Sequence, residues 1–202
     1  MENKNVLLID LEGTLWMYKA QDLDIVKSRP AADKEPYRAS GVGFDRYFDR
    51  YYNHSMFDML KNVKERYGFK NTIISLANGT ETYIELLEFF GQNLDSVMHS
   101  EKTDRGMFGD YEKKVGTKDV SRCVLIGDRL SDLYPDADEK GITFLNILFN
   151  PSEKDRIAAK KSIYICQTVQ DVQNAIDKFM EQQNLLEQNR MKILLNSMER
   201  NN

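Results

Sequence analysis

The chain has 202 residues, of which 41% are hydrophobic and 30% charged, and a formal net charge of −4. This composition is typical of one folded domain with modest additions and excludes a largely disordered chain. The net negative charge argues against a general nucleic-acid binder, and the longest apolar runs are much shorter than a membrane span. Met1–Asn5 leads directly into an apolar run, so we expect no signal peptide, and we expect the two cysteines, Cys123 and Cys166, to be buried thiols of a cytoplasmic protein.

The first apolar run covers Val6 to Asp10 and predicts a buried parallel strand. Asp10 ends this run, Glu12 follows two residues later, and Gly13 provides a sharp exit from the strand. Open α/β sheets bind their ligands beyond the carboxyl ends of the strands. Two carboxylates at this place can divide the work of a nucleophile and an acid or base.

Strand-like and helix-like segments alternate along the rest of the chain, which predicts βαβ units and a parallel sheet. We expect further strands at 72–75, 96–99, 123–126, 142–148 and 163–166, the last of them at an edge. We expect helices at 56–67, 80–90 and 107–115, each followed by a glycine, and a last helix that begins beside a Thr168/Asp171 capping box.

Two segments depart from this alternation. Residues 16–53 directly follow the acidic loop, and we interpret them as a flap or small lid insertion. The aromatic residues at positions 47, 48, 51 and 52 are predicted to form a helix face packed on the core, with stacking on a substrate as the alternative. Residues 181–202 are rich in Gln and Asn and predict a polar C-terminal helical tail that packs on itself or on a partner, or else a frayed, solvated end.

Polar residues follow four of the predicted strands, and the carboxyl ends of parallel strands meet at one edge of a sheet. They are the Asp10–Thr14 loop, Ser75 at the end of the second strand, Lys102 after the third, and Gly127-Asp128 with Asp132 after the fourth. A carboxylate that attacks a phosphate dianion meets charge repulsion, which Mg²⁺ and a lysine both offset. Asp10, the Glu12 carbonyl and Asp128 provide oxygen ligands of the kind Mg²⁺ prefers, with Asp132 nearby.

In this order the motifs resemble those of the haloacid-dehalogenase-like (HAD) superfamily of Mg²⁺-dependent phosphohydrolases: Asp-x-Asp-x-Thr, a Ser or Thr, a Lys, and Gly-Asp-x-x-x-Asp. The resemblance covers about residues 5–150. Lys113 and Lys114 compete with Lys102 for the lysine position, but Lys102 precedes a helix, as the family's lysine does.

The resemblance implies an α/β, Rossmann-like three-layer sandwich over residues 1–180, whose mostly parallel sheet has the order fifth, fourth, first, second and third strand. The segment between Ser75 and Asp128 is filled by βα units, so no large cap fits there. The implied activity is phosphomonoester hydrolysis through an aspartyl-phosphate. Its catalytic residues would be Asp10 as nucleophile, Glu12 as general acid and base, Ser75 and Lys102; Mg²⁺ would be held by Asp10, Glu12, Asp128 and Asp132.

Glu12 departs from the motif, which usually has Asp at this position, although enolase-phosphatases of the superfamily also carry Glu. The alternatives are therefore a catalytically impaired phosphate-binding or scaffold protein, or a phosphotransferase or mutase of the same fold. The expected partners are a phosphorylated small molecule or macromolecule, without membrane or nucleic acid, and a homodimer is left open.

Overall fold

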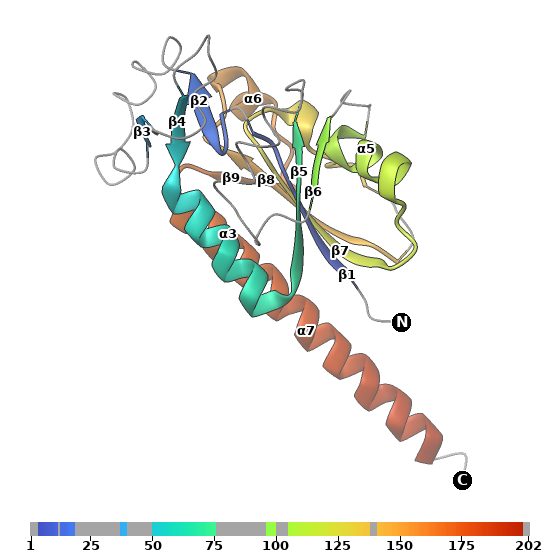
Figure 1. Cartoon of the computed structure of the whole chain (residues 1–202). Helices are drawn as coiled ribbons and strands as arrows, with labels where there is room; N and C mark the ends of the chain where they lie inside the picture. The colour runs from blue at the N-terminus through green and yellow to red at the C-terminus, as the bar shows by residue number, and fades with distance from the viewer. Residues whose placement is uncertain are drawn as a thin grey trace.

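The computed structural model describes residues 4–11, 13–18, 37–39, 50–75, 96–99, 105–137 and 141–199. Within these residues the largest unit is a six-stranded, wholly parallel sheet with the order β6-β5-β1-β7-β8-β9 (Figure 1). Its strands are β1 (Lys4–Ile9), β5 (Phe69–Ser75), β6 (Ser96–His99), β7 (Val120–Gly127), β8 (Thr143–Phe149) and β9 (Ile163–Cys166). The predicted strand order is confirmed, and segment 163–166 lies at an edge as expected.

Helices cover both faces of the sheet and make three layers (Figure 1). Alternate side chains of β1 point to opposite faces, as in any strand, so each face has its own core. Leu7 and Ile9 pack with α3 (His54–Tyr67) and the first part of α7 (Val169–Glu199). Val6 and Leu8 pack with α5 (Gly106–Val115) on the other face. Complete burial on both faces explains why residues 6–9 of β1 form a continuous apolar run in the sequence.

The helix boundaries follow local signals in the sequence. Gly68 ends α3 in the left-handed conformation, with φ of 65°. Thr168 and Asp171 form the predicted capping box, since each backbone N–H donates to the other's side-chain oxygen, at 3.0 and 3.1 Å. A short helix, α6 (Glu153–Ala158), was not predicted; the Ser152 hydroxyl accepts a hydrogen bond from its first turn.

α3 and α7 lie side by side, and a partly buried hydrogen bond is among the contacts that join them (Figure 1). The hydroxyl of Tyr67 donates to the carboxylate of Asp177 at 2.6 Å. Burial of the phenol and the neighbouring carboxylate raise the pKa of Tyr67 to about 12. The phenol therefore remains a hydrogen-bond donor at neutral pH, and this contact fixes the two helices relative to each other.

Part of the predicted insertion forms a small antiparallel sheet of three described strands, β2 (Trp16–Tyr18), β4 (Arg50–Asn53) and β3 (Tyr37–Ala39), in the order β2-β4-β3. The prediction of a helix at positions 51 and 52 is therefore wrong. Aromatic residues favour strands, and pairing with two neighbours decides the conformation here. Residues 19–36 and 40–49, including Tyr47 and Phe48, and the helix predicted at 80–90 lie outside the described residues.

α7 is one unbroken helix from Val169 to Glu199, so the segment after residue 180 continues the last helix of the domain. Among the helices that the structure describes, none is long and apolar enough to cross a membrane. Cys123 and Cys166 are both buried and not in a disulfide, as predicted. Burial raises the pKa of both thiols, that of Cys166 to about 12.

Candidate active site

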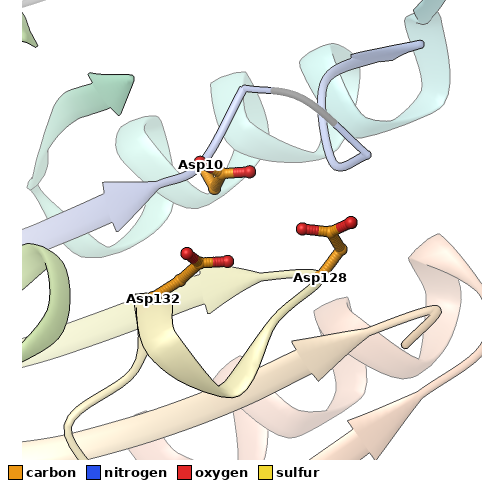
Figure 2. Close-up of side chains that lie close together, drawn as sticks. All are labelled: Asp10, Asp128 and Asp132. Carbon is orange, nitrogen blue, oxygen red and sulfur yellow. The ribbon is translucent and has the colours of Figure 1, made fainter. Parts of the chain in front are cut away.

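Carboxylates from two adjacent strands meet at the carboxyl edge of the sheet. Asp10 directly follows β1, Asp128 directly follows β7, and Asp132 ends the short 3₁₀ helix η2 (Leu130–Asp132). Within the described residues, these three form a cluster in which one carboxylate oxygen from each lies within 4.8 Å of the others. Figure 2 shows the three side chains pointing toward one another. Asp10 and Asp132 are 4% and 0% exposed, whereas the Asp128 side chain is 24% exposed, so the cluster is open to solvent on the side of Asp128.

The Asp10 loop is held by the strand beside it and by its own turn. The backbone N–H of Asp10 donates to the carbonyl of Ile126 on β7 at 2.9 Å. Leu11 and Leu15 are fully buried, and the N–H of Leu15 donates to the carbonyl of Leu11 at 2.8 Å. Both leucines anchor the loop in the core, so the Asp10 carboxylate has a fixed position at the strand end.

Two glycines allow the carboxylates to approach the backbone closely. Gly13 has a φ of 77°, and a Cβ built on it would lie 2.2 Å from Oδ2 of Asp128. A Cβ on Gly127 would lie 2.6 Å from both Cβ and Oδ2 of Asp132. Glycine is required at both places because any side chain would displace a carboxylate of the cluster.

The position of Asp132 depends on residues that the sequence analysis did not identify. Its Oδ2 accepts a hydrogen bond from the N–H of Arg129 at 3.0 Å, which closes η2 on itself. The N–H of Leu130 donates to Asp155 at the start of α6, at 3.3 Å. After η2, the buried side chain of Asn146 on β8 accepts from the N–H of Tyr134 at 2.8 Å and donates to its carbonyl at 3.1 Å.

Asn53 connects the small sheet to the Asp10 loop and was also missed. It is fully buried, its N–H donates to the carbonyl of Leu15 at 2.9 Å, and its side-chain amide donates to the carbonyl of Thr14 at 3.4 Å. Its Oδ1 accepts from the N–H of Met56 at 3.1 Å, so Asn53 is also the N-cap of α3. An Asn directly before a helix indicates an N-cap and is visible in the sequence. The contact of Asn53 with Thr14 is not, because the two residues are 39 positions apart.

We expect Asn53→Ala to lower the free energy of unfolding by about 2 kcal/mol, because it removes a helix cap and leaves a buried carbonyl with one donor fewer. It should also lower turnover, since the loop that carries Asp10 loses a support. Urea unfolding and steady-state kinetics measure the two effects. Thr168→Ala, which removes the cap of α7, is the matched control and should lower stability alone. Unchanged turnover in Asn53→Ala would show that this residue does not position the loop.

The other predicted site residues are less fully described. Ser75 is the last residue of β5, and β5 pairs with β1 so that Ile73 lies opposite Ile9. The backbone of Ser75 is thus at the same edge of the sheet as Asp10. Glu12 and Lys102 lie outside the described residues.

The cluster concentrates negative charge in a small volume. Arg129 Nε lies 3.9 Å from Oδ1 of Asp128, but its side chain is 60% exposed, and exposed pairs of this kind contribute little. Negative charges on carboxylates at this spacing repel one another, and a divalent cation offsets such repulsion. Carboxylate oxygens are the ligands that Mg²⁺ prefers, so the donor set fits this ion.

No protein-family model and no curated protein matches the sequence. Solved structures do match. A putative phosphoglycolate phosphatase from Lactobacillus delbrueckii subsp. bulgaricus is 14% identical, with a TM-score of 0.54 over 87% of this chain and 99% of that one. A D,D-heptose 1,7-bisphosphate phosphatase from Burkholderia thailandensis is 12% identical, with a TM-score of 0.49 over 87% and 99%. A HAD-superfamily hydrolase of subfamily IA from Geobacter sulfurreducens is 9% identical, with a TM-score of 0.45 over 84% and 97%.

The chain shares its fold with the putative phosphoglycolate phosphatase. The α/β, Rossmann-like fold predicted from the sequence is confirmed by the parallel sheet. The parallel sheet brings Asp10 close to Asp128 and Asp132, which lie more than one hundred residues later in the sequence.

Proposed function

We propose that the chain is a Mg²⁺-dependent phosphomonoester hydrolase that acts through an aspartyl-phosphate on Asp10. The observation that carries the proposal is the carboxylate cluster of Asp10, Asp128 and Asp132 at the carboxyl edge of the parallel sheet. The fold that the chain shares with a putative phosphoglycolate phosphatase adds support at the level of the fold.

In the proposed reaction, a carboxylate oxygen of Asp10 attacks phosphorus, and the bond from phosphorus to the ester oxygen breaks. Glu12 protonates the departing oxygen. Glu12 then takes a proton from water, which attacks the phosphorus of the aspartyl-phosphate and releases inorganic phosphate and free Asp10. The anchoring of the Asp10 loop supports Asp10 as the nucleophile, because attack on phosphorus requires the carboxylate to lie within a narrow range of positions.

Asp10, the backbone carbonyl of Glu12, Asp128 and Asp132 would hold the Mg²⁺ ion. The ion would offset repulsion between the carboxylates and the phosphate and polarise the phosphoryl oxygens. Ser75 would donate a hydrogen bond to a phosphoryl oxygen, and Lys102 would add positive charge beside the nucleophile. We propose a small phosphorylated molecule as the substrate.

Hydrolysis of p-nitrophenyl phosphate with Mg²⁺, and its loss on addition of EDTA, tests the proposal. A folded chain that hydrolyses no member of a broad panel of phosphate esters would favour the phosphate-binding alternative. Transfer of the phosphoryl group to an added sugar, in preference to water, would favour a phosphotransferase.

Glu12→Gln tests the division of labour between the two acids of the loop. We expect turnover to fall by about a hundredfold or more, because an amide can neither donate nor accept the required proton. Mg²⁺ affinity should stay within a few fold, since only the backbone carbonyl at this position would bind the ion. Isothermal titration with Mg²⁺ and steady-state kinetics measure both quantities. A collapse of Mg²⁺ affinity would contradict the assigned role.

A further inference from the structure

The start of α5 packs directly against the loop that carries Asp132. Gly106, the first residue of α5, is buried and has a φ of 58°. A Cβ built on it would lie 2.6 Å from the carbonyl oxygen of Asp132 and 2.5 Å from that of Leu133. The two backbones are therefore in contact, and a shift of α5 would be transmitted to the backbone of Asp132.

Arg105, the residue before this contact, links the helix to the loop. It is the N-cap residue of α5, and its guanidinium carbon lies 5.3 Å from the centre of the Phe108 ring and 5.2 Å from that of the Tyr134 ring. A cation at this distance is attracted to the face of an aromatic ring. Phe108 belongs to α5, whereas Tyr134 lies two residues after Asp132. The guanidinium therefore contacts both sides of the junction between α5 and the loop.

The rings beneath the guanidinium are packed together in a cluster of Phe108, Tyr134 and Phe144, which we call the ring cluster. The Phe108 and Tyr134 rings are nearly parallel, at an angle of 10°, with their centres 5.9 Å apart. Phe144 on β8 lies edge-on to both, at 4.8 and 5.6 Å. Asn146 on the same strand binds the backbone of Tyr134. The sheet thus holds Tyr134 in place, and Tyr134 gives Arg105 a fixed surface to pack on.

Two observations favour a positioning role for Arg105 over direct contact with a phosphate. Its side chain is only 27% exposed, because one face of the guanidinium lies over the ring cluster. Its Nη1 also donates to the carboxylate of Glu112, two turns further along α5. An arginine that binds phosphate usually offers a pair of N–H groups to the anion, and here an internal carboxylate already takes one of them.

We propose that Arg105 is a positioning residue for Asp132: through the ring cluster, its guanidinium holds the start of α5 against the loop that carries this carboxylate. Residues that support a metal ligand without touching the ion commonly fix the ligand's orientation. The inference rests on the proposed function, because it takes Asp132 to be a ligand of Mg²⁺. It does not depend on the transfer of a phosphoryl group.

Isothermal titration of the full chain with Mg²⁺ tests the proposal without any substrate. Arg105→Ala should raise the dissociation constant for Mg²⁺ by about tenfold, as is usual on loss of a residue that supports a metal ligand. The side chain is partly exposed, so the variant should fold, and circular dichroism checks this. Tyr134→Leu, which removes the ring on the other side of the junction, should by itself also raise the constant.

Arg66→Ala is the matched control. Arg66 also lies over a tyrosine ring, that of Tyr67, at 5.0 Å, and it also pairs with an acid, Asp177. These contacts are close to the start of β5, at the amino end of the sheet, whereas the carboxylate cluster is at the carboxyl end. Arg66→Ala should therefore leave the dissociation constant for Mg²⁺ unchanged.

A double-mutant cycle shows whether Arg105 acts through Tyr134. If it does, the variant that carries both Arg105→Ala and Tyr134→Leu should bind Mg²⁺ no more weakly than the weaker-binding single variant, because the second change removes a contact that is already lost. Effects that multiply in the double variant would show that the two residues act independently and would overturn the proposal.

The other outcomes separate this proposal from the proposed function. An unchanged dissociation constant in Arg105→Ala, or an equal increase in Arg66→Ala, would overturn the positioning role alone. Weaker Mg²⁺ binding in Arg105→Ala, in a chain that hydrolyses no phosphate ester, would support the positioning role and contradict the proposed function. An unmodified chain that binds no Mg²⁺ would overturn both.

Discussion

Asp10→Asn is expected to abolish phosphomonoester turnover and leave the fold intact. Asp10 is the proposed nucleophile, and an amide in its place forms no acyl phosphate. We expect a loss of about a thousandfold or more, which corresponds to about 4 kcal/mol of transition-state stabilisation. The substitution preserves volume, and the loop is anchored by Leu11 and Leu15, so thermal unfolding should change little.

Asp136→Asn is a matched control for this variant. Asp136 is an exposed aspartate whose carboxylate pairs with Lys160. Exposed ion pairs contribute about 1 kcal/mol or less, so neither stability nor turnover should change appreciably. Activity of Asp10→Asn above about a tenth of the unmodified rate would rule out Asp10 as the nucleophile.

Gly13→Ala is expected to remove both Mg²⁺ affinity and activity. The new methyl group would meet Oδ2 of Asp128 at 2.2 Å, so the carboxylate or the loop must move. A displacement of about 1 Å in a catalytic site can cost about a hundredfold in rate. The positive φ of 77° adds backbone strain of about 1–2 kcal/mol for a residue with a Cβ. Mg²⁺ titration, kinetics and urea unfolding measure the three effects.

Gly68→Ala separates the steric effect from the strain. Gly68 has a φ of 65°, and no described atom lies within 4 Å of the position where its Cβ would be. This variant should lose a similar amount of stability and keep its Mg²⁺ affinity. If Gly13→Ala also bound Mg²⁺ as tightly as the unmodified chain, the close packing of Gly13 on Asp128 would have no role in the metal site.

The parallel sheet could be predicted because its strands are buried on both faces. Such strands appear in the sequence as short apolar runs, as at 6–9 and 123–126, whose residues are all fully buried. The predicted and observed bounds also coincide at the two edge strands, 96–99 and 163–166. α6 was missed because it is short and carries no buried side chain, so its sequence has no apolar period. The small sheet was missed because its strands are short and β2 pairs with a segment more than thirty residues later, as Trp16 with Tyr52.

The carboxylate cluster could be predicted because each acid directly follows a strand, and the fold itself brings strand ends together. The residues that support it could not. Asn53 reaches Thr14 across 39 positions and Asp155 reaches Leu130 across 25, and neither contact has a local pattern. α7 continues beyond residue 180 because Gln, Leu, Lys and Met favour helices and no glycine or proline interrupts the segment to Glu199. The amide-rich composition alone suggested a separate tail.

The central claim is that a phosphoryl group passes through Asp10. The most direct measurement mixes the chain with Mg²⁺ and an aryl phosphate, quenches the reaction with acid, and maps the modified peptide by mass spectrometry. Glu12→Gln should accumulate the intermediate, because water is no longer activated. We predict one hydroxylamine-sensitive phosphoryl group on Asp10. Two results would contradict the proposed mechanism. In one, the ester is hydrolysed and the phosphoryl group is found on a residue other than Asp10. In the other, the ester is hydrolysed and neither the unmodified chain nor Glu12→Gln carries a phosphoryl group.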